Sequence, residues 1–253
     1  MISDPNCKKY QGRYFHLRYA LRSLAEVRGK VLDIGCGTGA ITHAIAQKRS
    51  DLVIYGCDND KKELAVFKKK YGYLGVRLLK ENACKLSFKN QEFAAVLVFD
   101  VLEHLSQPKK ALEEAARVLK KRGVFYLVVP LEAELFTVDG WLRLLGINLK
   151  EKPIGHIQQF KLREIKARLS QAGFKITQIR FSHHFFYQLF SLFYYVYVAL
   201  FKKGEYQCLV SENKSLNRVI LCLQSLLGRL IFWESSLLKQ VGGQTVHITA
   251  QKL

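Results

Sequence analysis

The chain has 253 residues, 49% of them hydrophobic, and a formal net charge of +19. This length and composition fit one α/β domain with an elaboration, and they exclude a wholly disordered chain. A strongly basic protein is attracted to nucleic acid, anionic membranes or acidic substrates, so the charge by itself does not choose a partner. The six cysteines are scattered without a C-x-x-C pair, and the N-terminus lacks an apolar signal segment. We therefore expect a reducing, cytoplasmic location.

The first predicted element is a helix over residues 8–28. Tyr14, Leu17, Leu21 and Leu24 recur at helical spacing and define its expected apolar face. The helix either covers a bound ligand or packs on the edge of a sheet.

Residues 31–39 read as a buried strand, a glycine-rich turn and the start of a helix over 40–48. Gly35 and Gly37 permit backbone angles closed to other residues and let a ligand lie against the main chain. The helix that follows offers free N–H groups and the positive end of its dipole. Asp33 is expected at the carboxyl edge of the sheet, where open α/β sheets bind their ligands.

Two classes of ligand use such a turn. Gly35-x-Gly37-x-x-Ala40 satisfies the loose dinucleotide fingerprint, which keeps a nicotinamide or flavin enzyme open. A carboxylate two residues before the first glycine instead suits a ligand with an ammonium group. The run DIGCGTG, from Asp33 to Gly39, closely resembles motif I of the class I S-adenosylmethionine-dependent methyltransferases. This resemblance implies S-adenosyl-L-methionine as cofactor, with Asp33 and the glycines Gly35, Gly37 and Gly39 near its methionine end.

A second buried strand is predicted over residues 52–58, and it ends in an acid. Asp58 follows Gly37 by 21 residues, the length of one βαβ step, and a carboxylate there accepts the hydroxyls of a ribose. Asn59 would then lie along the adenine. The alternative is that Asp58 only caps the helix predicted over 60–71. After a third strand over 76–79, the resemblance places Asn82 and Ala83 against the adenine, although an acid is commoner at the first position.

The fourth strand, residues 93–99, is a continuous apolar run, as expected for a strand covered on both faces. It ends at Phe99 and continues as DVLEHL, which resembles the methyltransferases of quinone biosynthesis and other small molecules. There the backbone after this strand lies against the cofactor. Asp100, Glu103 and His104 are expected on one helical face. His104 is our candidate general base; a metal site formed by the three and a purely structural role are the alternatives.

The rest of the core follows the same alternation. We predict a helix over 108–121, a strand over 124–130, a segment over 131–160 above the methyl group, a helix over 161–172, a strand over 174–181 and a last strand within 242–252. His156 is expected either in the substrate pocket or as an exposed loop residue. The resemblance implies a Rossmann-like seven-stranded sheet of order 3-2-1-4-5-7-6 with strand 7 antiparallel, and covers about residues 30–182 and 243–252.

An insert separates the last two strands. We expect residues 1–184 and 241–253 to form the cofactor-binding domain and residues 185–240 a helical insert. Residues 185–201 have no charge and many aromatic rings, and a helix over 215–239 is amphipathic. This favours peripheral membrane contact or binding of a lipid-like substrate over a transmembrane anchor, because the last strand must return to the sheet. A cap packed on the domain, with a dimer contact, is the structural alternative.

The function predicted from the sequence is methyl transfer to an oxygen of a small or lipid-like acceptor. An RNA methyltransferase is disfavoured, because no N/D-P-P-Y motif follows the fourth strand and no RNA-binding module is evident. A nicotinamide-dependent oxidoreductase and a silent membrane-associated scaffold stay open. The location would then be the cytoplasm, at the inner face of a membrane if the insert binds one. The sequence does not predict an oligomeric state.

Overall fold

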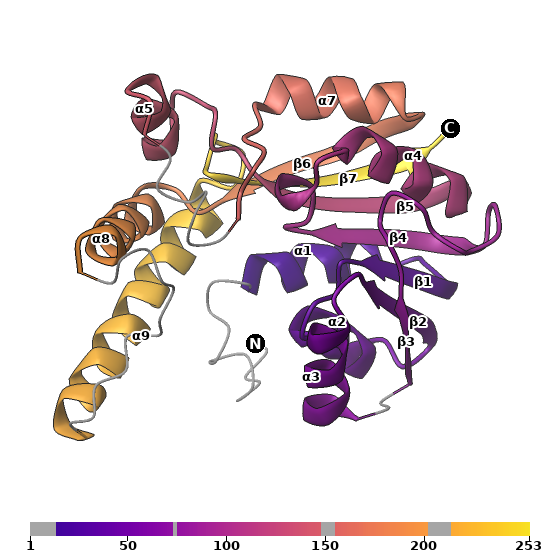
Figure 1. The fold of residues 1–253 in the computed structure, drawn as a ribbon, viewed down its shortest axis with the longest axis horizontal. Helices are drawn as coiled ribbons and strands as arrows, with labels where there is room; N and C mark the ends of the chain where they lie inside the picture. Colours follow the sequence, from indigo (N-terminus) through magenta and orange to yellow (C-terminus); the bar gives the residue numbers. More distant parts are fainter. Residues whose placement is uncertain (1–13, 73–74, 148–154, 202–213) are drawn as a thin grey trace.

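The computed structural model describes residues 14–72, 75–147, 155–201 and 214–253, which form one seven-stranded sheet with helices on both faces (Figure 1). The strand order is β3-β2-β1-β4-β5-β7-β6, and β7 is antiparallel to both neighbours. This confirms the predicted fold class. The strands are β1 (Gly29–Ile34), β2 (Leu52–Asp58), β3 (Val76–Lys80), β4 (Phe93–Phe99), β5 (Leu119–Pro130), β6 (Phe174–Ser182) and β7 (Thr245–Lys252).

Two hydrophobic cores lie on the two faces of the sheet. Neighbouring residues of a strand point to opposite faces, so Val31 enters one core and Leu32 the other. Burial on both sides explains why the central strands are apolar throughout. The Val31 core includes α1 (Tyr14–Ser23), α2 (Ala40–Lys48) and α3 (Lys61–Tyr71). The Leu32 core includes α4 (Pro108–Val118) and α7 (Leu162–Gln171).

The buried surface of α1 is wider than the predicted face. Within α1 the structure buries Phe15, His16, Tyr19 and Ala20, and Leu24 just beyond it. Of the predicted face, Tyr14, Leu17 and Leu21 are only partly buried against the same core. Apolar residues recur at helical spacing on both sides of this helix, so periodicity alone could not choose between them. The residues predicted as helical before Tyr14 lie outside the described part of the chain.

The boundary between α4 and β5 also differs from the prediction. The helix ends at Val118, three residues early, and Leu119 already pairs with Phe93 of β4. Leu119 is fully buried in the Leu32 core, and this burial outweighs the helical preference of the lysines that follow. Arg122 then adopts a positive φ of 58°, which redirects the chain into the predicted strand.

The insert between β6 and β7 contains two long helices, α8 (Phe185–Phe201) and α9 (Lys214–Leu237), close to the predicted ranges. Glu234 joins them: its buried carboxylate accepts hydrogen bonds from the backbone N–H groups of Phe185 (3.0 Å) and Phe186 (3.1 Å). A negative charge at a helix N-terminus is favourable. Within the described residues, neither these helices nor any other is long and apolar enough to cross a membrane.

Three helices next to the last three strands lie at one end of the molecule. The short helix α5 (Val138–Leu144) follows β5, α8 follows β6, and α9 leads into the antiparallel β7 (Figure 1). They therefore lie beyond the carboxyl ends of the parallel strands, which is where ligand sites form in this architecture. The prediction that residues 131–160 lie over this edge holds for the described residues, 131–147 and 155–160.

Candidate active site

The glycine-rich turn after β1 is packed against the ends of β2 and β4. The N–H groups of Gly35 and Cys36 both donate to the carbonyl oxygen of Cys57, at 2.8 and 2.9 Å. Gly35 has a φ of +74°, and a Cβ there would lie 2.4 Å from a methyl carbon of Val101. Only glycine fits this position, because both the backbone angle and the space exclude a side chain.

Gly37 and Gly39 have different surroundings. A Cβ on Gly39 would lie 2.1 Å from the ring of Phe67, a buried core residue, so Gly39 is required for packing. A Cβ on Gly37 would have Glu63 Oε2, 3.8 Å away, as its nearest neighbour. The main chain at Gly37 is thus open, and a ligand can approach it closely. Of the three glycines, Gly37 is the one whose lack of a side chain is not explained by protein packing.

Asp33 is buried inside the site rather than displayed at its surface. It lies in β1, and its Oδ2 accepts a hydrogen bond of 2.6 Å from the Thr42 hydroxyl of α2. Burial and the charge of Asp33 raise the pKa of the Cys36 and Cys57 thiols. These cysteines are therefore protonated at neutral pH and are not nucleophiles. The predicted contact of Asp33 with a ligand stays a prediction.

Asp58 is held between the turn and the next helix. Its Oδ2 accepts from the N–H of Gly37 and its Oδ1 from the N–H of Asp60, both at 2.9 Å. Asp60, and not Asp58, caps α3 by accepting from the N–H of Lys62 at 2.7 Å. The alternative in which Asp58 merely caps that helix is therefore wrong. Asp58 is half-buried, which leaves room for its carboxylate to accept further hydrogen bonds.

The other predicted cofactor residues also lie at the carboxyl edge. Asn59 is exposed next to Asp58. Asn82 follows β3, is exposed, and accepts a 2.9 Å hydrogen bond from the N–H of Cys84, so it shapes its own loop; Ala83 beside it is half-buried. Phe99 ends β4, is buried, and stacks on the ring of His16 at 6.4 Å.

The predicted helical face of Asp100, Glu103 and His104 does not exist. After β4 the chain forms only a three-residue 3-10 turn, Leu102–His104, and Asp100 precedes it with a positive φ of 51°. Asp100 instead pairs with His16 of α1, whose Nε2 lies 3.0 Å from its Oδ2. A turn this short cannot place residues 100 and 104 one above the other. Asp100 therefore does not share a face with Glu103 and His104.

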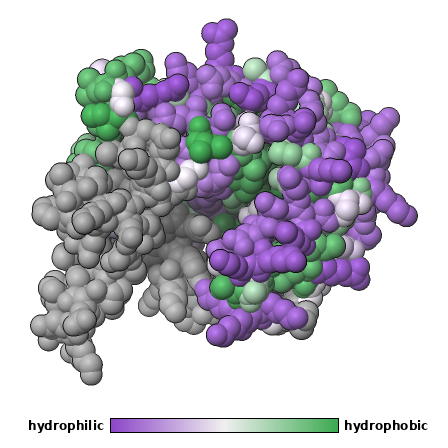
Figure 2. Space-filling model, in the orientation of Figure 1, coloured by the Kyte–Doolittle hydropathy of each residue, from purple (hydrophilic) through white to green (hydrophobic). Residues whose placement is uncertain are grey.

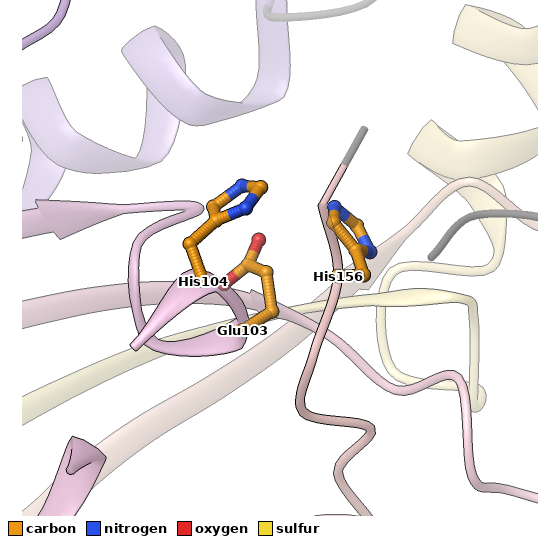
Figure 3. Close-up of side chains that lie close together, drawn as sticks. All are labelled: Glu103, His104 and His156. Carbon is orange, nitrogen blue, oxygen red and sulfur yellow. The ribbon is translucent and has the colours of Figure 1, made fainter. Parts of the chain in front are cut away.

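Glu103 and His104 are joined by His156 from the segment before α7 (Figure 3). One ligand-type atom from each lies within 4.8 Å of the others. The two imidazole rings meet edge to face, with centroids 4.9 Å apart. Glu103 and His156 are buried and His104 is exposed, so the cluster is accessible from one side. Carboxylate oxygen and imidazole nitrogen are also ligand types that bind divalent cations.

Hydrogen bonds define which nitrogen of each ring carries a proton. His104 Nδ1 lies 3.0 Å from the carbonyl oxygen of Gly155, and His156 Nδ1 lies 2.9 Å from the buried Glu132 carboxylate. A carbonyl oxygen can only accept, and an ionised carboxylate likewise, so both Nδ1 atoms carry hydrogen. In a neutral His104 ring, Nε2 then has the lone pair. Although His104 is exposed on one side, partial desolvation of its ring lowers the pKa, an effect that the Gly155 carbonyl partly offsets, so this ring is neutral at pH 7.

Sequence reasoning missed two residues here, Glu132 and His16. Glu132 stands two residues after β5, and nothing in the local pattern marks it as the partner of His156. His16 could have been noticed, because it lies three and four residues before the buried Tyr19 and Ala20.

The burial of His156 and its contacts with Glu132 and His104 place it within the candidate site. They exclude the alternative of an exposed loop histidine.

Residues 32–127 match the family model of a methyltransferase domain. Over 173 residues the chain is 27% identical to a ubiquinone biosynthesis O-methyltransferase of Azorhizobium caulinodans, covering 65% of this chain and 66% of that protein. An uncharacterised methyltransferase of Bacillus subtilis, YcgJ, is 31% identical over 144 residues, which cover 56% of this chain and 55% of YcgJ. The chain thus spans between about half and two thirds of these curated relatives.

Solved structures agree on the fold. A putative methyltransferase from Bacillus halodurans superposes with a TM-score of 0.62 at 18% identity, covering 92% of this chain and 97% of that one. Together with the sheet order and the site at its carboxyl edge, the match over residues 32–127 defines the class of protein. Residues 32–127 of this chain form a methyltransferase domain of the type 11 kind. The resemblance inferred from DIGCGTG is thereby confirmed at the level of a methyltransferase domain.

Proposed function

We propose that this protein transfers a methyl group from S-adenosylmethionine to a hydroxyl oxygen of a small or lipid-like acceptor, with His104 as general base. The observation that supports an oxygen acceptor is the protonation state of His104: its Nδ1 hydrogen is held by Gly155, and Nε2 keeps a lone pair. Relatives that are named for ubiquinone, menaquinone and phytyl-hydroquinone methylation support a small aromatic or lipid-like acceptor.

The open main chain at Gly37 and the half-buried Asp58 suit the cofactor. When S-adenosylmethionine is bound, its sulfonium group supplies a methyl group that is already activated for transfer. We propose that Asp33, Gly35, Gly37 and Gly39 surround its methionine part and that Asp58 accepts both ribose hydroxyls. The adenine would be lined by Asn59, Asn82 and Ala83, with Phe99 bordering the cofactor at the end of β4. In this proposal the chain binds and orients, and it excludes water with the segment that carries His156.

His104 would take the proton of the acceptor hydroxyl on Nε2 as the oxygen attacks. The imidazolium that forms keeps its Nδ1 hydrogen on the Gly155 carbonyl. The nearby charges of Asp100 and Glu132 favour the protonated ring, whereas burial and His156 disfavour it. Glu132 fixes the orientation of His156, which in turn contacts the edge of His104. Glu132 and His156 are thus positioning residues in this proposal.

The insert and the division of the chain belong to the same proposal. We propose residues 1–184 and 241–253 as the cofactor-binding domain, and residues 185–240 as an insert through which the protein touches a membrane or a lipid-like acceptor. The contacts of Glu234 with α8 support an insert organised as one unit.

Calorimetric titration of the purified chain with S-adenosylmethionine, S-adenosylhomocysteine and NADH tests the proposal. We expect saturable binding of the first two only. Methylation of a quinol-type hydroxyl acceptor, measured with labelled cofactor, should then depend on His104. Binding of NADH alone would favour the oxidoreductase alternative. Cofactor binding with methylation of RNA, or with no turnover of hydroxyl acceptors, would favour the RNA enzyme or the silent scaffold and contradict the proposal.

A further inference from the structure

The exposed apolar side chains of this protein are concentrated on one end of the molecule. Apart from Val53, Val66, Ile157 and Leu253, every large hydrophobic side chain found exposed in the described residues lies between 135 and 147 or between 185 and 241. These are the segments of α5, α8 and α9, which Figure 1 shows together beyond the sheet. Figure 2 shows the apolar side chains of the α5 end of this surface in green.

We call this surface the apolar face and define it by Leu135, Phe136, Trp141, Leu144, Leu145 and Ile147 on the α5 side and by Phe185, Leu189, Phe190, Phe193, Leu226, Leu230, Phe232, Trp233, Leu237, Leu238 and Val241 on the insert. Exposed apolar side chains gathered in this number at one end of a folded protein mark a binding site rather than ordinary exposure.

The apolar face contains both tryptophans of the chain. Trp141 and Trp233 are each 62% exposed, although tryptophan is highly buried in most proteins. A tryptophan ring has an apolar body and a polar N–H, which favours the boundary between lipid tails and headgroups. Their exposure at the two sides of one face therefore indicates a lipid interface.

Hydrogen bonds and packing hold the two sides of the face together. The N–H of Val138 in α5 donates to Gln188 Oε1 of α8 at 2.8 Å, and the amide of Gln244 donates to Asp139. The Phe136 ring packs over Gly242, where a Cβ would lie 2.9 Å from it. The α5 segment and the insert are thus anchored to each other rather than being separate patches.

The charges on the apolar face favour a negatively charged partner. Among its described residues the acids are withdrawn from solvent: Glu234 is buried under the N-terminus of α8, and Asp139 is half-buried against Gln244. The basic residues Arg143, Arg229 and Lys239 are exposed. With a net charge of +19 on the chain, this complements the anionic surface of a bilayer.

We propose that α5, α8 and α9 dock together on an anionic lipid bilayer, lying in its interface without crossing it. This extends the membrane contact proposed for residues 185–240 to a composite face that includes α5. The segment carrying α5 also carries Glu132, the partner of His156. The face therefore lies next to the candidate base, and, if the proposed function holds, the acceptor enters directly from the membrane.

Tryptophan fluorescence reports this contact directly, because both tryptophans of the chain lie on the apolar face and no other tryptophan contributes to the signal. We expect a blue shift and co-sedimentation with vesicles of phosphatidylcholine and phosphatidylglycerol in equal parts, and much weaker binding to phosphatidylcholine alone. Changing Leu144→Ser and Leu145→Ser together should weaken partitioning about tenfold or more, because two exposed apolar anchors are lost. The matched control, Val53→Ser with Val66→Ser, removes exposed apolar side chains elsewhere and should bind like the wild type.

Absent binding to the anionic vesicles, or equal losses in the variant and its control, would overturn the proposal. A concentration-dependent dimer that the Leu144/Leu145 variant converts to monomer would assign the face to a second copy of the chain instead. Cofactor titration of the same preparations separates the two proposals. Cofactor binding without vesicle binding contradicts only the docking face, whereas vesicle binding without cofactor binding contradicts only the proposed function.

Discussion

Asp58 and Gly37, 21 residues apart in the chain, are joined by a 2.9 Å hydrogen bond from the Gly37 N–H to Asp58 Oδ2. The bond ties the end of β2 to the most open point of the glycine-rich turn. The carboxylate proposed to hold the ribose thus also holds the backbone proposed to hold the methionine part. Cofactor binding is therefore expected to be most sensitive to this pair.

The substitution Asp58→Ala should weaken S-adenosylmethionine binding about 10- to 100-fold, because charge-assisted hydrogen bonds contribute about 1.5–3 kcal/mol each. Asp60→Ala is the matched control, since Asp60 lies two residues away and only caps α3. It should cost about 1 kcal/mol of stability and leave affinity unchanged. Calorimetry and thermal unfolding of both variants make the comparison, and equal cofactor affinity of Asp58→Ala and wild type would refute the ribose assignment.

Gly37→Ala and Gly39→Ala should separate binding from folding. Both positions have positive φ, which costs an alanine about 1–2 kcal/mol. At Gly39 the new methyl also collides with the buried Phe67 ring, which adds about 1–3 kcal/mol of overpacking. We expect Gly39→Ala to lose much more stability in denaturant titration, and Gly37→Ala to lose mainly cofactor affinity. A Gly37→Ala variant with native affinity would show that no ligand approaches this turn.

His104→Ala should lower kcat/KM about 10²- to 10⁴-fold without changing cofactor affinity, because it removes a general base. His104 can act as a base only while its Nε2 is unprotonated, so kcat/KM should fall as the pH drops through the His104 pKa. Partial desolvation of the ring keeps that pKa below the ordinary value of about 6.5, so activity at pH 7 should already be on the plateau.

The pH profile of kcat/KM tests this assignment, and the acid limb should disappear in His104→Ala. His43→Ala is the matched control: burial also lowers the pKa of His43, but it stacks on Tyr71, away from the carboxyl-edge cluster. A profile that the His104 substitution leaves unchanged would contradict the role of base.

Chelation distinguishes the base from a metal site on the same residues. If His104 Nε2 takes a proton, dialysis against EDTA should leave the methylation rate unchanged. If the rate falls and Mn²⁺ or Zn²⁺ restores it, Glu103, His104 and His156 act as metal ligands and the base assignment is wrong. Elemental analysis of the purified protein provides the second measurement.

The resemblance to the methyltransferases implied the order of the strands in the sheet. The sequence by itself determined the β-turn-α unit at Asp33–Gly39, the positions of the strands along the chain and the position of the insert. These follow from local causes: apolar runs long enough for buried strands, glycines at positions that need positive φ, and helical periodicity. Where local signals were balanced, burial in the core decided. In α1 a second set of side chains is buried beside the predicted face, and the prediction was wrong at Val118, where α4 ends before the lysines.

Only the tertiary structure decided which polar side chains meet. Glu132 and His156 are 24 residues apart, Phe185 and Glu234 49, and His16 and Asp100 84. No periodicity relates such pairs, because they are brought together by the sheet topology and by the need to pair buried polar groups. The glycine-rich turn after β1 was therefore readable from sequence, whereas the cluster around His104 and the apolar face were not.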